Sequence, residues 1–188
     1  MQDPDAFVGW DALTVFIVAE GNNIAKNGDI IGKNGGGTEG WRFGKETGSD
    51  TRWVLRGTTG NEVQTFTYGI NVKRVWSLVY GGGIRKSHGD GSEKESYTDS
   101  GTIATAPLSP LSIGGRSTID GSPANFAQAM ISEVLVYKRA LPDDERRKIE
   151  GYLAHKWGLD GNLDVSHPFK STAPDFSDPA AGVEDNMI

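Results

Sequence analysis

The sequence predicts an all-β fold, a sandwich of two antiparallel sheets of the jelly-roll type with one short helix near the C-terminal end. Its apolar residues fall in short runs rich in β-branched and aromatic side chains. Glycine is unusually frequent, at 26 of 188 residues, and marks turns between these runs. A single segment has helical signals, so strands and helices do not alternate as they would in a parallel α/β fold.

The first half of the chain reads as a series of strands. Leu13–Ala19 is the most apolar run, and its length and β-branched residues favour a buried strand over a helix. The following segment, 20–40, is rich in Asn, Gly and Asp and predicts a loop or a brief hairpin around Ile30 and Ile31. Three short strands are then expected, over Trp41–Gly44, Thr51–Arg56 and Glu62–Tyr68.

Alternation of side chains identifies the faces of the later strands. In Val72–Tyr80, the large residues that share one face are predicted to lie in the core: Trp76, Leu78 and Tyr80. Short strands are expected over Ile84–Lys86, Lys94–Tyr97, Gly101–Thr105 and Leu111–Gly114, with His88–Ser92 as a polar hairpin tip. The longest candidate is Phe126–Tyr137, where one face is expected to hold Ile131, Glu133, Leu135 and Tyr137.

The predicted helix begins near Pro142, which suits a first turn, and ends at Gly158, which suits a C-terminal cap. Its apolar stripe is expected to dock on a sheet, and consists of Ile149, Tyr152, Leu153 and Trp157. The nearby bases are expected on a solvated face: Lys138, Arg139, Arg146, Arg147 and Lys148. One domain is predicted over residues 1–170, followed by an acidic tail or linker over 171–188.

Composition excludes several classes of function. The net charge is −6, and the acidic tail accounts for four of these charges, so the remaining body has no basic footprint for nucleic acid. The chain has no cysteine, which excludes disulfides, thiol catalysis and zinc–thiolate sites. No apolar run is long enough to insert into a membrane, and residues 1–12 do not resemble a signal peptide. An export signal, if used, is therefore expected outside this chain.

One stretch resembles a known family. ISEVLVYKRALPDDERRKIEGYLAHKWGL, followed by HPFKSTAP, resembles the end of the laminin-G-like, concanavalin A-type domains of large bacterial surface and secreted proteins. LTVFIVA and TRWVLRGTTGN resemble their earlier strands, so the likeness covers most of Leu13–Pro174. The resemblance implies a concanavalin A-like jelly roll, secretion or a bacterial cell-surface location, and a Trp157 that anchors the helix to the sheet.

The sequence departs from that family in one respect. Members usually have several strands before the LTVFIVA-like strand, whereas only twelve residues precede Leu13 here. The departure predicts a sheet edge left uncovered, and uncovered edges attract other strands. A homodimer or a strand-swapped arrangement is therefore one open alternative, and a trimmed version of the fold is the other.

No catalytic residues are predicted. A retaining glycoside hydrolase needs two carboxylates about 5–5.5 Å apart, but Glu133 is alone on its strand face. Glu93 and Glu95 have a suitable spacing, yet they lie in a polar hairpin and read as exposed charges. His88 and Tyr97 lack the companions that a polysaccharide lyase uses, and the remaining histidines, His155 and His167, read as structural.

The predicted function is a non-catalytic carbohydrate-binding or adhesion module of a larger extracellular protein. Its partners would be a polysaccharide or glycan and neighbouring domains of the same polypeptide. Sugars need flat aromatic rings and polar groups for their hydroxyls, and the candidates for these are Trp41, Trp53, Tyr97, Asn22, Asn23 and Asp90. The alternatives are a structural or protein-interaction spacer and, less favoured, a glycoside hydrolase or polysaccharide lyase of the same fold.

A structural calcium ion is the one cofactor expected, because this superfamily often binds calcium through loop oxygens. The candidate ligands are Asp29, Asp99 and Asp120, with further loop oxygens on Asn27, Asn34, Asp90 and Asn125. These residues lack the regular spacing of an EF-hand. Turn formation is the alternative role for most of them, because Asn and Asp favour turn geometry.

Overall fold

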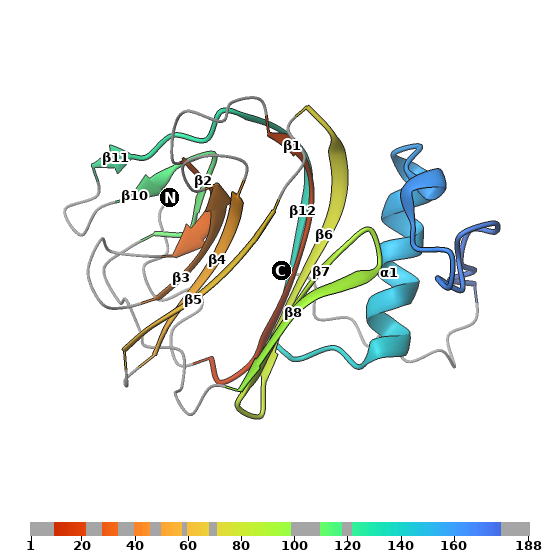
Figure 1. Ribbon diagram of the computed structural model, residues 1–188, viewed down its shortest axis with the longest axis horizontal. Helices are drawn as coiled ribbons and strands as arrows, with labels where there is room; N and C mark the ends of the chain where they lie inside the picture. The colour runs from red at the N-terminus through yellow and green to blue at the C-terminus, as the bar shows by residue number, and fades with distance from the viewer. Residues whose placement is uncertain are drawn as a thin grey trace.

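The computed structural model describes residues 10–21, 28–33, 40–45, 50–57, 60–67, 71–98, 110–117 and 122–177. Within this part the chain forms two five-stranded antiparallel sheets stacked face to face, with one helix outside one of them (Figure 1). The predicted two-sheet sandwich with one short C-terminal helix is therefore confirmed. No helix of the described part is both long and apolar enough to cross a membrane.

Sheet A contains the strongest predicted strands. Its order is β12–β1–β6–β7–β8, formed by β12 (Ala129–Tyr137), β1 (Leu13–Gly21), β6 (Lys73–Gly81), β7 (Ile84–Gly89) and β8 (Ser92–Thr98). The inner strand β1 pairs along almost its whole length with both neighbours, β12 and β6. Its sequence is an apolar run because both of its faces are covered: Val15 and Ile17 pack in the core toward sheet B, and Phe16 and Val18 pack with α1.

Sheet B faces sheet A across the core and has the order β5–β4–β3–β2–β9. These strands are β5 (Gly60–Thr67), β4 (Asp50–Gly57), β3 (Gly40–Lys45), β2 (Gly28–Lys33) and β9 (Ser112–Ile113). A small hairpin, β10 (Arg116–Ser117) with β11 (Pro123–Ala124), lies beside β2. Of the expected loop or brief hairpin around Ile30 and Ile31, the structure has the hairpin: β2 pairs antiparallel with β3, and both isoleucines are buried in the core.

The main core lies between the sheets. Trp76, Leu78 and Tyr80 of β6 project into it, as their alternation predicts. They meet Trp41 and Phe43 of β3, and the rings of Phe43 and Trp76 lie 5.7 Å apart. Burying several aromatic side chains of this size supplies much of the hydrophobic stabilisation of a small sandwich.

A β-bulge changes one predicted face of β12. Val18 of β1 pairs with Glu133, but Ala19 pairs with Ile131, so Ser132 is an extra residue. The side chains therefore change faces at this point. Ile131 packs against the inter-sheet core, whereas Leu135 packs on the helix side. The expectation that Ile131 and Leu135 share a face is wrong, because strict alternation does not anticipate a bulge.

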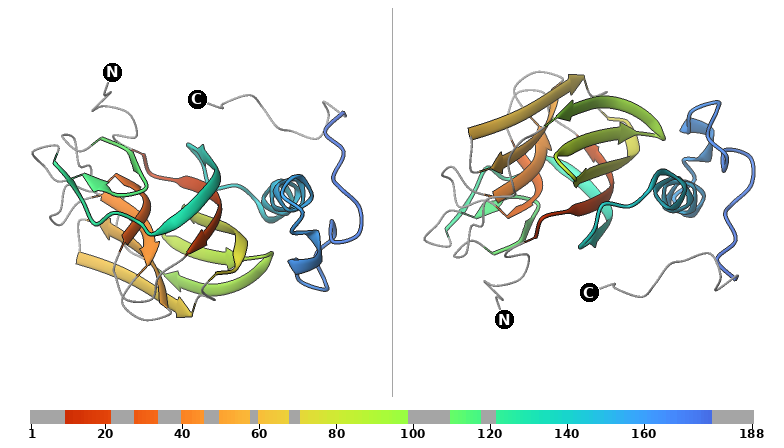
Figure 2. Two further views of the ribbon diagram at one scale, coloured as in Figure 1. Left: turned by 90° about the horizontal axis from the view of Figure 1, so that it is seen from above. Right: turned by 90° about the horizontal axis from the view of Figure 1, so that it is seen from below.

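Helix α1 (Asp143–Lys156) packs on the outer face of sheet A, away from sheet B (Figure 2). Pro142 precedes its first turn, and Gly158 beyond its end has φ 67°, a conformation that glycine adopts without strain. Ile149 and Leu153 are buried against sheet A, as the sequence pattern predicts. Tyr152, which was predicted in the same stripe, is instead 38% exposed and packs against Phe176. A short 3₁₀ helix, η1 (Asp160–Asn162), follows.

One residue of α1 differs from the prediction of a solvated face: Arg146, which is buried together with Glu150. Arg146 and Glu150 are buried under the helix, 2% and 1% exposed. They form an i, i+4 ion pair with 2.5 Å between Arg146 Nη1 and Glu150 Oε1. Charge alone does not reveal this, because a buried ion pair and an exposed one have the same helical spacing.

Candidate functional site

The predicted sugar-stacking residue Trp41 lies in the core. Its side chain is 2% exposed and packs with Phe43 and Trp76 between the sheets. It has no ring face for a sugar, so this prediction is wrong: β3 directs Trp41 inward and its neighbour Arg42 outward. Trp53 lies in β4, but its side chain is outside the described residues, as are Asn22 and Asn23 entirely.

Asp90, the predicted polar contact, serves the turn between β7 and β8. It has φ 51°, its carboxylate accepts a hydrogen bond from the backbone N–H of Val75 at 3.0 Å, and it is ion-paired with Arg74. Burial raises the pKa of Asp90, while these two partners oppose the rise. Both carboxylate oxygens are used within the fold, so Asp90 holds the hairpin in place and does not face a ligand.

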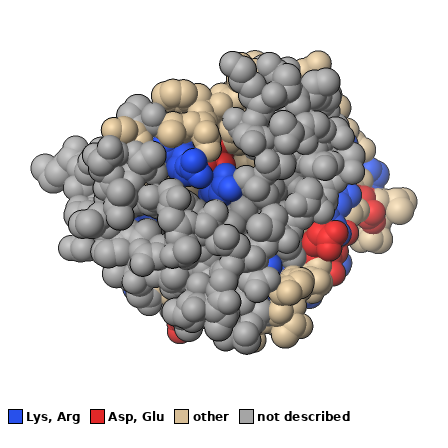
Figure 3. Space-filling model, turned by 60° about the vertical axis from the view of Figure 1, so that its left-hand side comes forward, with Lys and Arg blue, Asp and Glu red and all other residues tan. Residues whose placement is uncertain are grey.

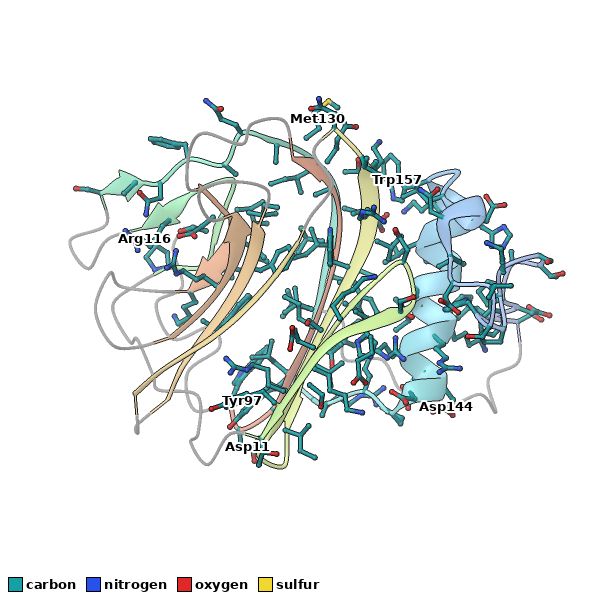
Figure 4. All side chains as sticks on the ribbon, viewed as in Figure 1. Asp11, Tyr97, Arg116, Met130, Asp144 and Trp157 are labelled. Atoms are coloured by element: carbon teal, nitrogen blue, oxygen red, sulfur yellow. The ribbon has the colours of Figure 1, made fainter. Side chains whose placement is uncertain are left out.

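Tyr97 is half-exposed on the edge strand β8, and the guanidinium of Arg85 lies 5.2 Å from its ring centre. Figure 4 shows Tyr97 at one end of sheet A, far from Arg116 in the β10 hairpin. Its role in binding remains a prediction. The structure therefore does not bring Trp41, Asp90 and Tyr97 together into one site.

The predicted calcium ligand Asp29 is paired with an arginine. It is buried in β2, and Arg42 Nη1 lies 2.7 Å from its Oδ1. A cation is thus already present where the calcium ion was expected. Asp99 and Asp120 lie outside the described residues, and the described part contains no group of three or more acidic, His or Cys side chains arranged for a metal.

The same Asp29 marks the candidate site, on the outer face of sheet B. Two guanidinium groups approach its carboxylate: that of Arg42 at 2.7 Å and that of Arg116, whose Nε is 3.9 Å from Oδ2. The second distance is too long for a hydrogen bond. Arg42 comes from β3, Asp29 from β2 and Arg116 from β10, so three separate strands build this arrangement.

Glycines and a bulge create the space for this cluster. The register between β2 and β3 shifts at Asp29, which marks an irregularity in the pairing. A Cβ on Gly44 would lie 3.0 Å from Asp29 Oδ1, and one on Gly32 would lie 2.8 Å from the Cβ of Arg42. Both glycines therefore make room for the ion pair, which a larger side chain would displace.

The cluster has polar atoms that lack partners. No described residue hydrogen-bonds Asp29 Oδ2, Arg42 Nε or Arg116 Nε, although all three atoms are buried. Two guanidiniums against one carboxylate leave one excess positive charge in a protein with net charge −6. Figure 3 shows basic side chains with an acidic one beside them on this side of the molecule. Buried polar groups without partners are uncommon in folded proteins.

An exposed aromatic ring borders the cluster. Phe126 is 63% exposed, and its backbone forms an isolated bridge with Asp29. Behind it, a Cβ on Gly115 would lie 3.3 Å from the ring, so Gly115 lets the ring sit close to the hairpin. Ile113 in β9 is also exposed. The site combines an apolar ring with cationic donors, a pairing that suits the flat faces and polar groups of a sugar.

Sequence reasoning missed Arg42, Arg116 and Phe126. Arg42 alternates with Trp41 and Phe43 along β3, and that alternation was the available signal that it faces outward. Arg116 and Phe126 had none, because they reach Asp29 through the β10 hairpin and an isolated bridge. Such contacts are tertiary and have no periodicity in the sequence.

A second charged cluster lies between sheet A and α1. Ser77 Oγ donates a hydrogen bond to Glu150, Arg146 is ion-paired with it, and His167 Nε2 is 3.3 Å from its second oxygen. Burial pushes the pKa of Glu150 up, but the hydrogen bonds and charges of these partners leave it below the usual value. Burial and, next, the charge of Arg146 lower the pKa of nearby His88 to about 4.

Glu133 and Trp157 join β12 to the end of α1. Trp157 Nε1 donates to Glu133 at 2.6 Å, and Lys156 Nζ donates to its other oxygen at 2.9 Å. Trp157 therefore anchors the helix to the sheet, as the resemblance implies. Glu133, which the sequence places alone among the acids of its strand face, is thus held by helix side chains. His155 and His167 both have structural contacts, as predicted.

Comparison with known proteins shows the family and the fold. A family model described as the concanavalin A-like lectin/glucanases superfamily matches residues 12–145. No curated protein matches the sequence. Among solved structures, the carbohydrate-binding module CBM40 of the Ruminococcus gnavus IT-sialidase, bound to α2,3-sialyllactose, is similar with a TM-score of 0.62 and 15% identity, over 72% of this chain and 80% of that one.

Two other structures have the same fold. The NanB sialidase from Streptococcus pneumoniae matches with a TM-score of 0.62 and 12% identity over 78% of this chain, which spans only 25% of the sialidase. A heptameric pentraxin from Limulus polyphemus matches with a TM-score of 0.55 and 13% identity, over 74% of this chain and 70% of that one. At these identities the likeness concerns the fold.

Proposed function

The chain belongs to the concanavalin A-like lectin/glucanases superfamily, and on this basis we propose that it is a non-catalytic carbohydrate-binding module that takes an acidic sugar beside Arg116. The observation that carries the proposal is the partly exposed Arg116 guanidinium, whose Nε lies 3.9 Å from Asp29, with the exposed Phe126 ring in the segment that bridges to Asp29. The ring would stack on the apolar face of a pyranose, and Arg116 would bind a carboxylate substituent.

The charge balance of the cluster favours an acidic over a neutral sugar. Arg42 is held by Asp29 at 2.7 Å, so its charge is largely compensated, whereas Arg116 is at 3.9 Å and remains available. A ligand carboxylate would supply the second acceptor that this arrangement lacks. The similar CBM40 structure contains sialyllactose, whose sugar is acidic, and this supports the choice of ligand class.

A binding role also agrees with the remaining acidic residues. In the described part, the buried carboxylates of Glu150 and Asp90 are used by structural partners, and Glu133 is bound to the end of α1. None of them faces a second carboxylate across a cleft, as glycoside hydrolysis would require. We accordingly propose that the module acts within a larger secreted or cell-surface protein, where it tethers that protein to a glycan.

The test is titration of the folded chain with sialyllactose and with lactose, which lacks the carboxylate. We expect wild type to bind sialyllactose and Arg116→Gln to bind it at least 10-fold more weakly, because a charge-assisted hydrogen bond contributes about 1.5–3 kcal/mol. Lys138→Gln, which removes an exposed positive charge elsewhere, should bind like wild type. Repeating the titration with calcium and with a chelator tests the predicted calcium ion.

The result that overturns the proposal is equal binding of sialyllactose by wild type and Arg116→Gln. Binding of lactose as tightly as sialyllactose would show that the carboxylate does not contribute to binding and would contradict the proposed preference for an acidic sugar. If a broad glycan array shows no binding at all, the alternative of a structural or protein-interaction spacer replaces it.

A further inference from the structure

Helix α1 and the residues after it form one unit outside sheet A, the α1 unit, residues 143–170 (Figure 2). Its last part, residues 159–170, is the strap, which joins α1 to the turn between β7 and β8. His155 Nε2 of α1 is 2.9 Å from the carbonyl oxygen of Phe169, and the backbone N–H of Asp164 donates to the carbonyl of Asp90 at 2.9 Å. The helix and the strap therefore meet sheet A together.

The α1 unit has an apolar core of its own. The residues buried between it and sheet A form a cluster that is separate from the core between the two sheets. This cluster includes Phe16 and Val18 from sheet A, and Leu153 and Leu163 from the α1 unit. Movement of the unit away from sheet A would leave the inter-sheet core intact. A 14-residue helix is marginal on its own in water, so α1 would lose its hydrogen bonds on release.

His88 of β7 lies in the polar part of the same interface. Its side chain is 2% exposed, and its Nδ1 is buried with no hydrogen-bond partner among the described residues. Its Nε2 is 3.8 Å from Glu93 Oε2, which is too long for a hydrogen bond. A neutral imidazole donates one proton and an imidazolium donates two. The docked state therefore suits the neutral form of His88.

The charges around His88 also favour its neutral form. Arg146 and Glu150 are buried as deeply as His88, and their charges cancel. The side chains of Glu93 and Asp143 are 48% and 63% exposed, so water screens their charges. A proton on His88 therefore adds a positive charge to a buried pair that is already neutral. The titratable and charged groups that face His88 or contact these neighbours are Asp143, Arg146 and Glu150 of α1, His167 of the strap, Glu93 of β8 and Lys86 of β7.

We propose that acidic pH releases the α1 unit from sheet A through protonation of His88, while the two sheets stay folded. Burial and, next, the charge of Arg146 lower the pKa of His88 to about 4 in the docked state, whereas the exposed residue would have its ordinary pKa of 6.5. The released state therefore binds the proton first as the pH falls. Docking is strongest above pH 6.5 and weakens toward pH 4, and the ratio of released to docked molecules should rise about 20-fold between pH 7 and pH 5.

Release would change the outer face of sheet A and leave sheet B unchanged. It would expose Phe16 and Val18 to water and detach the chain beyond β12 from the sandwich. The cluster of Asp29 and Arg116 is built on sheet B and the β10 hairpin, away from the α1 unit. The acid-triggered release is thus separate from the proposed sugar site and does not rest on it.

The experiment is hydrogen exchange of the full chain, without glycan, at pH 7 and pH 5, with each rate corrected for the intrinsic effect of pH. We expect the protection of the amides of Ile149–Ala154 to fall about 20-fold at pH 5. At both pH values it should stay below the protection of β1, whose amides exchange only when the sandwich opens. In His88→Gln the fall should be less than about 3-fold, because the titrating group is absent. The matched control, His155→Gln, should behave like wild type.

Three results would overturn the proposal. Equal protection of α1 and β1 at both pH values would mean that the helix opens only when the whole domain unfolds. Protection of α1 that is the same at pH 7 and pH 5 would show that no release occurs, and both of these results come from wild type alone. An equal fall in wild type and His88→Gln would assign the release to another group. Because no glycan is present, failure here leaves the binding proposal intact.

Discussion

The two outer faces of the sandwich both contain buried charges, but they use them differently. On sheet A, Glu150 has partners on both carboxylate oxygens and lies beneath α1. On sheet B, the carboxylate of Asp29 has one oxygen bonded to Arg42 and the other without a hydrogen bond from any described residue. We call the first cluster closed, because both oxygens of its carboxylate have partners, and the second open, because one oxygen of Asp29 has no hydrogen bond from a described residue.

This difference shows that buried charge by itself does not identify a binding site. Structural ion pairs also perturb pKa values, and His88, whose pKa is lowered to about 4 by burial and by the charge of Arg146, lies near the closed cluster. The bonding of the carboxylate separates the two clusters, because both oxygens of Glu150 have partners whereas Asp29 Oδ2 has no hydrogen bond from a described residue. An exposed aromatic ring beside the open cluster, Phe126, strengthens the distinction.

The largest expected effect is on the closed cluster. Glu150→Ala would leave Arg146 buried without its counter-ion, so we expect the free energy of unfolding to fall by about 3–5 kcal/mol. Thermal unfolding would then shift down by roughly 10 °C. Glu95→Ala, at an exposed position of β8, should have little effect. A loss of under about 1 kcal/mol for Glu150→Ala would mean that the cluster contributes little to docking α1.

The closed cluster should also make stability depend on pH. His88 has a pKa of about 4 in the folded protein against 6.5 ordinarily, so the unfolded chain binds this proton first as the pH falls. The free energy of unfolding should therefore decrease from pH 6.5 to pH 4, by up to about 3 kcal/mol from this group.

Urea unfolding of wild type and His88→Gln at pH 7 and pH 4.5 measures the contribution of His88. The variant should lose less stability than wild type between the two pH values. His155→Gln, which changes a histidine that contacts the carbonyl of Phe169, should retain the wild-type difference. Identical pH dependence in wild type and His88→Gln would contradict the assignment.

A smaller effect is expected where α1 meets β12. Trp157→Phe retains a ring but removes the Nε1 donor to Glu133, so we expect a loss of about 1–2 kcal/mol. Lys156→Gln, which removes the exposed partner of the same carboxylate, should cost less than Trp157→Phe because solvent screens the charge of Lys156. If both variants lose the same free energy of unfolding, the part-buried hydrogen bond from Trp157 contributes no more to stability than the exposed one from Lys156.

The smallest effect on stability is expected at the open cluster. Phe126→Ala should change the free energy of unfolding by no more than about 0.5 kcal/mol, since the side chain is mostly exposed. The same substitution should weaken sialyllactose binding about 3- to 10-fold, as expected for losing a ring contact of about 0.5–1.5 kcal/mol. A large loss of stability with unchanged binding would instead show that Phe126 has a structural role and does not contact the ligand.

The sequence by itself determined the elements of the fold. The apolar run of β1, the alternation of Trp76, Leu78 and Tyr80, and the helix that begins after Pro142 all follow from local periodicity and turn chemistry. The motif around Trp157 identified the family. These features were predictable because each depends on residues close together in the chain.

Only the tertiary structure decided which polar residues are used and which remain open. Trp41 was assigned to the surface and lies in the core, Arg146 was assigned to solvent and is buried, and Ile131 changed faces at a bulge. The cluster of Asp29 and Arg116 joins residues 87 positions apart across a strand and a hairpin. Burial and pairing depend on which strands become neighbours, and that is a property of the packed sheets and has no signature in local sequence.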